Sequence, residues 1–433
     1  MSNFSKIGVL ASTLFMSFSL LANNLFKAED VFSLEYANDP QISPNGKQVV
    51  YVRNSLDIMK DNKNRNLWLV DTKTGEQLPL FSDNKQYSKP RWSPDGKKIA
   101  FVSNLSGSYQ IHVHYLNENR TALVSQVQGG ISSLTWSPNG DWLAFSQKVK
   151  GKPTVISKMP KKPKGAKWAD PVIVIDQAYY QADGRGLIKP GYQHIFVIPS
   201  TGGTPRQITS GNYHHRGTLA WTKDNKSIVF SANRIEDWEY KSLEGSLFQV
   251  EVNSGKLTQL TDQAGKEFNP VFSPDGKKLA FLSTSGELNP YRNAKLNIME
   301  WSDKKSKMIA KDFDRSIQDP QWLSTSKLAI AYDDFGKRKI AVITTKGKVT
   351  DLTDSASGTT IGRPYISGEF SASTEGKIAY THGSAQRPAD VAVVTSKKKV
   401  KQLTQLNEDT LGHKTLGKVH EINYKSSFDG EPI

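Results

Sequence analysis

Two short segments of the sequence carry side chains that could bind a charged ligand. Residues 236–239 read Glu-Asp-Trp-Glu, and Arg185 lies between two glycines. Two carboxylates that face a cavity suit an ammonium group, because charge-assisted hydrogen bonds would hold it. The planar guanidinium of Arg185 could bind a carboxylate or a carbonyl oxygen. The alternative is that Glu236 and Glu239 belong to a solvated turn, and the sequence leaves both interpretations open.

The other reactive residue types do not form a recognisable catalytic or metal site. The chain has no cysteine, which excludes a cysteine nucleophile and a thiolate metal site. His112 and His114 lie on one face of an expected strand and His214 and His215 are adjacent, but a metal needs three or four converging ligands. No Gly-x-Ser-x-Gly motif occurs, so no nucleophile elbow is expected. We predict no catalytic residue, no metal and no cofactor in this chain.

The composition is that of a folded, basic protein. Of the 433 residues, 37% are hydrophobic and 10% aromatic, which is enough to bury a core and excludes a disordered chain. The 57 basic and 42 acidic residues give a net charge of +15. The lysines are scattered, and the densest runs, at residues 158–167 and 397–401, are not interleaved with aromatic residues. We interpret them as solvated faces and predict no nucleic-acid partner.

The first 22 residues resemble an export signal. Lys6 is the only charge before Lys27, and residues 7–21 are apolar but diluted by Ser, Thr and Gly. This stretch is too short and too polar for a stable membrane span. We therefore predict a signal peptide over residues 1–22 and a periplasmic or secreted protein without a membrane span.

A phrase that recurs about every 50 residues organises the rest of the chain. It consists of an aromatic residue, Ser-Pro-Asp/Asn-Gly-Lys and an apolar run, as in RWSPDGKKIAFV from Arg91. Asp-Gly or Asn-Gly between two apolar runs predicts a tight hairpin turn, and the run after it predicts a strand. The copies, some of them degraded, begin at Gln41, Arg91, Thr135, Ala220, Val271, Gln321 and Phe370. A second hairpin follows each copy, for example NLWLVDTKTGEQLPL from Asn66.

Four strands in each of seven repeats predict an all-β fold, a seven-bladed β-propeller over residues 40–420. A short helical lead-in is expected at residues 23–39. No blade borrows a strand from the other end of the chain, so we expect the first and last blades to meet through apolar packing. One step between repeats is long, 85 residues from Gly140 to Asn225. We expect the surplus, at about residues 159–190, to be a functional insertion.

Four further segments stand in order along the chain: residues 26–36 (FKAEDVFSLEY), 182–186 (ADGRG), 231–240 (SANRIEDWEY) and 424–430 (YKSSFDG). With the repeats, this set resembles the N-terminal propeller half of a serine peptidase of the prolyl oligopeptidase family, in the acylaminoacyl-peptidase and bacterial dipeptidyl-peptidase-like branch. The resemblance implies a propeller that covers an active site and screens peptides. It also implies that Glu236 and Glu239 hold the amino terminus of the substrate.

The resemblance bears on the end of the chain as well. Residues 421–433 are expected to begin an α/β-hydrolase domain whose catalytic residues would lie beyond residue 433, so that this chain alone is predicted to be inactive. The missing hydrolase domain and a peptide substrate are the expected partners.

Two functions stay open at this point. In the first, the chain is the substrate-gating propeller of an exported serine peptidase that cleaves peptides or oligopeptides. In the second, it is a free-standing periplasmic binding propeller similar to the propeller protein of the Tol–Pal system. The terminal segment YKSSFDGEPI favours the first.

Overall fold

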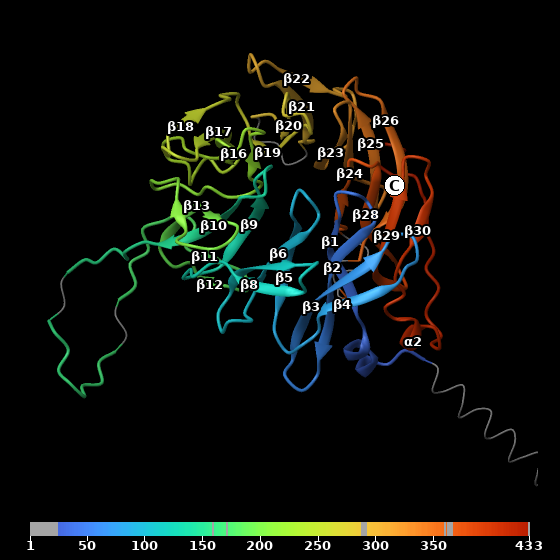
Figure 1. Ribbon diagram of the computed structural model, residues 1–433, viewed down its shortest axis with the longest axis horizontal. Coiled ribbons are helices and arrows are strands. Elements are labelled where there is room, and N and C mark those ends of the chain that lie inside the picture. Colours follow the sequence, from blue (N-terminus) through green and yellow to red (C-terminus); the bar gives the residue numbers. More distant parts are fainter. Residues whose placement is uncertain are drawn as a thin grey trace, which may run out of the picture.

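The chain folds almost entirely into antiparallel β-sheet (Figure 1). The computed structural model describes residues 25–157, 160–169, 172–286, 292–358, 361 and 367–431, so the predicted signal peptide lies outside the described residues. The helices within these ranges are the 3-10 helix η1 (Ala28–Ser33) and the α-helix α2 (Glu408–Leu411). Neither of them is long and apolar enough to cross a membrane. The all-β prediction is confirmed.

Successive stretches of chain form four-stranded sheets, most of them in simple hairpin order. The first sheet contains β1 (Tyr36–Ile42), β2 (Gln48–Asp57), β3 (Asn62–Asp71) and β4 (Gln77–Phe81). The second contains β5 (Tyr87–Trp92), β6 (Lys98–Ser103), β7 (Gln110–Tyr115) and β8 (Arg120–Leu123). The third contains β9 (Ile131–Trp136), β10 (Trp142–Lys150), β13 (Gly191–Pro199) and β14 (Arg206–Gln207).

The same pattern continues toward the C-terminus. The fourth sheet contains β15 (Ala220–Trp221), β16 (Ser227–Ala232), β17 (Ser246–Glu251) and β18 (Leu257–Gln259). The fifth contains β19 (Glu267–Phe272), β20 (Lys278–Ser283), β21 (Lys295–Glu300) and β22 (Ser306–Ile309).

The last strands form one sheet of eight. It contains β23 (Gln318–Ser324), β24 (Lys327–Asp334), β25 (Lys337–Thr344), β26 (Val349–Ala356), β27 (Phe370–Ala372), β28 (Lys377–Ser384), β29 (Arg387–Thr395) and β30 (Val400–Gln402). The pairing of Ala356 with His382 joins β26 to β28, and it divides the eight strands into two runs of four. We call the run from β27 to β30 the last sheet.

The predicted lead-in at residues 23–39 contains the helix η1 and also the start of a strand. β1 begins at Tyr36, and its pairing with β2 shifts register between Asn38 and Gln41. Asp39 takes the left-handed conformation there, with φ 49°. Pro40 cannot donate a ladder hydrogen bond, and a bulge allows a strand to accommodate it. Asp39 and Pro40 are therefore part of the first strand, which begins inside the predicted lead-in.

The long step between the third and fourth repeats lies inside the third sheet, as predicted. Residues 151–190, which we call the insertion, connect β10 to β13. The insertion carries its own small hairpin, β11 (Gln181–Ala182) paired with β12 (Gly186–Leu187). Figure 1 shows the insertion projecting from the body of the protein.

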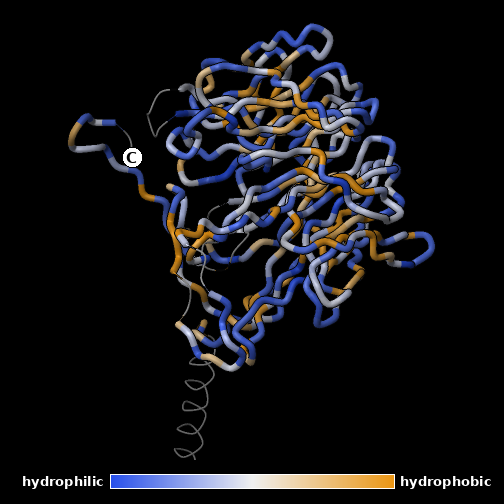
Figure 2. Tube along the Cα trace, turned by 90° about the vertical axis from the view of Figure 1, so that its left-hand side faces the viewer, coloured by the Kyte–Doolittle hydropathy of each residue, from blue (hydrophilic) through white to orange (hydrophobic). Residues whose placement is uncertain are grey.

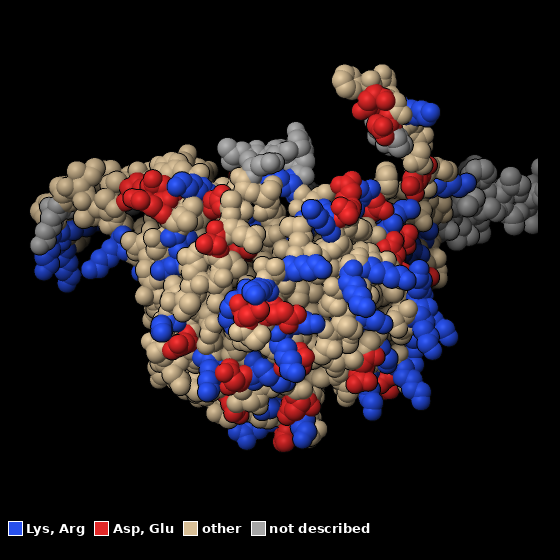
Figure 3. Space-filling view, turned by 90° about the horizontal axis from the view of Figure 1, so that it is seen from above, with Lys and Arg blue, Asp and Glu red and all other residues tan. Residues whose placement is uncertain are grey.

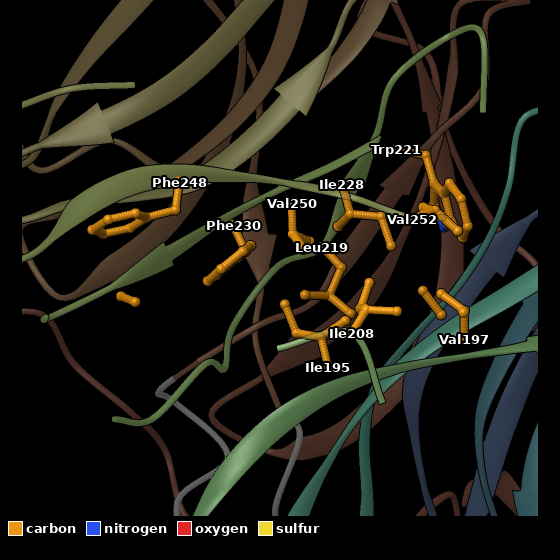
Figure 4. Packing of buried hydrophobic residues seen from close by; sticks show 12 residues of the cluster. Ile195, Val197, Ile208, Leu219, Trp221, Ile228, Phe230, Phe248, Val250 and Val252 are labelled. Carbon is orange, nitrogen blue, oxygen red and sulfur yellow. The ribbon is translucent and has the colours of Figure 1, made fainter. Parts of the chain in front are cut away.

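Apolar clusters lie between neighbouring sheets and hold them face to face. The hydropathy colouring of Figure 2 places the apolar residues inside the body along the strands. One cluster joins the third and fourth sheets, where Ile195 and Val197 of β13 pack with Ile228 and Phe230 of β16 (Figure 4). These four side chains are fully buried. Burial of this kind stabilises a β fold mainly through the hydrophobic effect.

The first and last sheets meet through side chains, without exchange of a strand. Ala37, Val49 and Tyr51 pack in one cluster with Ala379 and Val391. Two polar contacts reinforce this junction, which we call the seam. The Ile42 N–H donates to Ser371 Oγ at 2.7 Å, and Lys377 Nζ donates to the Gly46 carbonyl oxygen at 2.9 Å. The seam thus combines apolar packing with hydrogen bonds between the first sheet and the last sheet.

The Ser-Pro-Asp-Gly phrase folds as a hairpin turn held by its own side chains. In the copy before β20, Asp275 Oδ1 accepts from Ser273 Oγ at 2.6 Å and from the Lys277 N–H at 3.2 Å. These hydrogen bonds hold the pKa of Asp275 below its ordinary value. Gly276 completes the turn with φ +74°, a conformation that costs residues with a Cβ about 1–2 kcal/mol.

Alanine substitutions at two of these turns are expected to differ in cost. Gly96 has φ +70° and its added Cβ would lie 3.6 Å from Pro44 Cδ, which is ordinary contact, so Gly96→Ala should cost about 1–2 kcal/mol. At Gly276 the added Cβ would lie 2.5 Å from Lys223 Cβ, so Gly276→Ala should destabilise the protein more. Urea unfolding followed by circular dichroism measures both, and equal losses would contradict the assigned close approach to Lys223.

Candidate functional site

A cavity of about 900 Å³ lies where the insertion meets the third, fourth and fifth sheets. Its wall includes Arg185 of the insertion, Gln193 of β13 and Phe268 of β19. The segment between β16 and β17, which we call the 233–245 loop, adds Trp238 and Glu239. A cavity of this size is large enough for a short peptide or another small ligand.

Hairpin geometry places Arg185 at this cavity. The residues between β11 and β12 form a tight turn in which the Arg185 N–H donates to the Ala182 carbonyl oxygen at 3.1 Å. The hairpin continues into Ile188, whose N–H donates to the Tyr180 carbonyl oxygen at 2.7 Å. The Arg185 side chain is exposed and lines the cavity.

Glu239 ties the insertion to the neighbouring sheet. Its Oε2 accepts a hydrogen bond from the Ala178 N–H at 2.7 Å. The 233–245 loop that carries it is folded on Asn233, whose Nδ2 donates to the Lys241 carbonyl oxygen at 2.7 Å. Glu236, three residues earlier, is exposed and is not part of the cavity lining. The structure therefore brings two of the three predicted residues, Arg185 and Glu239, to one cavity.

An aromatic group forms one side of the cavity. The ring of His214 contacts Trp238 edge to face, with 5.4 Å between ring centres, and Tyr192 at 5.3 Å. Burial, together with the nearby charges of Arg216 and Lys148, lowers the pKa of His214 to about 4. His214 is therefore neutral at pH 7. Its Nδ1 accepts from the Gln193 N–H at 3.2 Å, which places its proton on Nε2.

A second histidine network lies beside this group. Arg234 Nη1 donates to His215 Nε2 at 2.5 Å, and so His215 carries its proton on Nδ1, which lies 3.2 Å from His194 Nδ1. His215 is fully buried, and burial lowers its pKa to about 3. The Arg234 guanidinium stacks over Tyr213 at 4.5 Å. The network fixes the backbone that carries His214.

Charged side chains elsewhere are mixed. Figure 3 shows Lys and Arg side chains interspersed with Asp and Glu over the face seen from above. The mixed pattern agrees with the interpretation of the scattered lysines as solvated faces.

Several residues of the cavity had no signal in the sequence. Lys148 lies on β10, Arg216 follows β14 and Lys266 precedes β19, so they are far apart in the sequence and converge only in the folded chain. The adjacent residues His214 and His215 were not assigned to a site from the sequence, and in the structure His214 lines the cavity while His215 is buried beside it. The length of the insertion was the one feature that located the site.

Two known family profiles match parts of this chain. The profile of the TolB β-propeller domain matches residues 26–167. The profile of the dipeptidyl peptidase IV N-terminal region matches residues 179–291, which include most of the cavity residues.

Two relatives that are named as peptidases are similar to this chain in sequence. The chain is 30% identical to the uncharacterized peptidase YuxL of Bacillus subtilis over 213 residues, which cover 49% of this chain and 32% of that protein. It is 24% identical to dipeptidyl-peptidase 5 of Porphyromonas gingivalis over 312 residues, which cover 68% of this chain and 44% of that protein. The match to each relative thus covers less than half of that relative's length.

Solved structures share the fold. The acylaminoacyl peptidase of Pyrococcus horikoshii matches 92% of this chain and 56% of its own, with a TM-score of 0.70 and 17% identity. The β-propeller domain of the trilobed protease of Pyrococcus furiosus, described as having an open velcro topology, matches 87% of this chain and 97% of its own, with a TM-score of 0.58 and 17% identity.

The sheets and these matches define a β-propeller domain of the class found in TolB and in the N-terminal region of dipeptidyl peptidase IV. More particularly, the resemblance seen in the sequence is confirmed. The profile of the dipeptidyl peptidase IV N-terminal region and the two peptidase relatives support the family resemblance.

Proposed function

We propose that this chain is the substrate-binding propeller of an exported peptidase, a ring of seven blades. The cavity between the insertion and the 233–245 loop carries the proposal, because it gathers residues of three sheets and the insertion around one space of about 900 Å³. The blade number rests on seven four-stranded runs, with the eight-stranded sheet counted as two blades. Export and a periplasmic location rest on the sequence of residues 1–22.

Within this proposal, Arg185 and Glu239 contact the peptide. Arg185 is exposed at the cavity and has a planar group that suits a carbonyl or carboxylate oxygen. Glu239 holds the insertion in place through the Ala178 N–H, and an anionic oxygen can accept further hydrogen bonds. We do not assign Glu236 to the site, because it lies outside the lining. The sequence contains no Gly-x-Ser-x-Gly motif, so we expect this chain by itself not to hydrolyse peptides.

A peptide-capture experiment tests the proposal. The full chain is dialysed against a tryptic digest of casein, and the retained peptides are measured by mass spectrometry. We expect retention by the wild type and a loss of about tenfold for Trp238→Ala, because Trp238 forms part of the cavity wall. Tyr109→Ala is the matched control, since Tyr109 is an exposed aromatic residue outside the cavity.

The outcome separates the two functions that the sequence left open. Absence of retained peptides, or equal retention by Trp238→Ala and the wild type, would contradict the peptide-binding propeller. The second candidate, a free-standing binding propeller similar to the Tol–Pal protein, draws its support from the TolB profile over residues 26–167. It predicts capture of a folded protein partner and no dependence on Trp238.

A further inference from the structure

The charged groups around the cavity are unequal in number. Five cationic side chains and two carboxylates belong to its lining. The cations are Lys148, Arg185, Lys189, Arg216 and Lys266, and the carboxylates are Glu239 and Glu244. The cations come from the insertion, from β10 and from the loops before β15 and β19, so the excess of positive charge belongs to the cavity as a whole.

Each of the two carboxylates accepts a hydrogen bond from a backbone N–H group. Glu239 Oε2 accepts from the Ala178 N–H at 2.7 Å, and Glu244 Oε2 accepts from the Gly265 N–H at 2.7 Å. Each of them joins two segments of the cavity wall. These hydrogen bonds help to hold the wall together, and the two carboxylate charges offset only part of the five positive charges of the lining.

The five cations have no carboxylate partner within the ion pairs of the described residues. Lys148 Nζ donates to the Lys189 carbonyl oxygen, and burial lowers the pKa of Lys148. Lys266 lies over the ring of Phe268 at 5.5 Å. Arg216 and Lys148 lie close enough to His214 to add to the lowering of its pKa that burial causes. A concave surface lined by one sign of charge concentrates ligands of the opposite sign.

The uncharged lining suits a peptide. Gln193, Asn233 and Asn269 carry side-chain amides, which can donate to peptide carbonyls and accept from peptide N–H groups. Trp238 and Phe268 offer apolar surface to neighbouring side chains. Amide donors, aromatic surface and unpaired cations together match a peptide that carries a carboxylate.

We propose that this cavity selects peptides that present a carboxylate, from an acidic side chain or from a free C-terminus, to Arg185 and Arg216. The inference rests on the proposed peptide-binding function and names the class of peptide. A carboxylate that enters the cavity forms charge-assisted hydrogen bonds with guanidinium groups, which are the stronger kind.

Titration calorimetry on the full chain tests this selection with one peptide series. The reference is N-acetyl-Ala-Ala-Gln-Ala-Ala-amide, which has no charge, and two others replace Gln with Glu or with Lys. A fourth peptide keeps Gln and has a free C-terminal carboxylate, so that side-chain and terminal carboxylates are distinguished. We expect the Glu peptide, the free-carboxylate peptide or both to bind about tenfold more tightly than the reference, and the Lys peptide to bind most weakly. The preference should weaken from 50 to 300 mM NaCl.

Variants connect the preference to the two arginines. The double variant Arg185→Gln/Arg216→Gln should lose the preference, so that the four peptides bind it with similar affinities. Arg120→Gln/Lys397→Gln removes two exposed charges outside the cavity and should keep the preference. Equal affinity of the wild type for all four peptides would overturn the charge selection and leave the peptide-binding proposal intact. Failure of every peptide to bind would contradict the proposed function itself, and the selection with it.

Discussion

Replacing Tyr51 by alanine is expected to lower the free energy of unfolding by about 3–5 kcal/mol, the range for loss of a large buried aromatic side chain. Tyr51 lies on β2 and is fully buried in the seam, where it packs with Ala379 and Val391 of the last sheet. Its hydroxyl donates to Gln77 Oε1 at 2.8 Å, so the substitution removes both apolar contacts and a hydrogen bond. The loss would weaken the junction between the two ends of the sheet array. Urea unfolding followed by tryptophan fluorescence and circular dichroism measures the change.

Phe101→Ala is the matched comparison, because Phe101 is equally buried but packs between the first and second sheets. If the seam stabilises the protein as an ordinary contact between sheets does, the two substitutions should have similar costs. A cost below about 1 kcal/mol for Tyr51→Ala, beside a full cost for Phe101→Ala, would show that the first and last sheets contribute little to each other's stability.

Acidification below pH 6.5 is expected to destabilise the protein through His215. The pKa of this buried histidine falls from its ordinary value of 6.5 to about 3, because burial and the Arg234 guanidinium oppose a second proton. Above pH 6.5 the histidine is neutral in both the folded and the unfolded chain, so the full stability is present. Between pH 6.5 and 3 the unfolded chain binds a proton that the folded chain does not bind. The free energy of unfolding then falls by up to about 1.4 kcal/mol per pH unit from this one group.

His215→Gln isolates this contribution. Glutamine can accept from Arg234 and donate to His194, but it does not titrate. The slope of stability against pH between 6 and 4 should therefore be shallower in His215→Gln than in the wild type. The comparison is necessary because burial raises the pKa of Glu267, which acts in the opposite direction. His413→Gln, at an exposed histidine, should leave the slope unchanged, and an unchanged slope in His215→Gln would contradict the assignment.

The order of the hairpins along the chain could be predicted from the sequence because the same turn recurs in it. Gly46, Gly96 and Gly276 all have the positive φ that the Asp-Gly and Asn-Gly pairs predict, and a hairpin surrounds each of them. Local chemistry decides these turns, so one sequence is enough to find them. The start of β1 was missed for a similarly local reason. Residues 23–39 were expected to be helical, and the bulge at Asp39 and Pro40 lets a strand begin among them at Tyr36.

Only the part of the site that lies in or near the insertion could be predicted from the sequence. Arg185 and Glu239 stand near the long insertion, and the insertion indicated where a ligand would bind. Lys148 lies on β10, whereas Arg216 and Lys266 lie in the loops before β15 and β19, and their convergence depends on how the third, fourth and fifth sheets pack. No spacing rule within one strand or hairpin connects residues that far apart, so the excess of cations could not be seen before the fold was known.

The seam has a consequence for the way the chain folds during synthesis. Each sheet is built from one continuous stretch, so its hairpins can form as soon as that stretch leaves the ribosome. The first sheet can therefore form early, but the face that carries Ala37, Val49 and Tyr51 finds its partner only in Ala379 and Val391. That apolar face stays uncovered until nearly the whole array has been made. Nascent chains that lack the last sheet should therefore bind chaperones or aggregate. In chains that include the last sheet, the first and last sheets should cover each other's apolar faces and become protected from both outcomes.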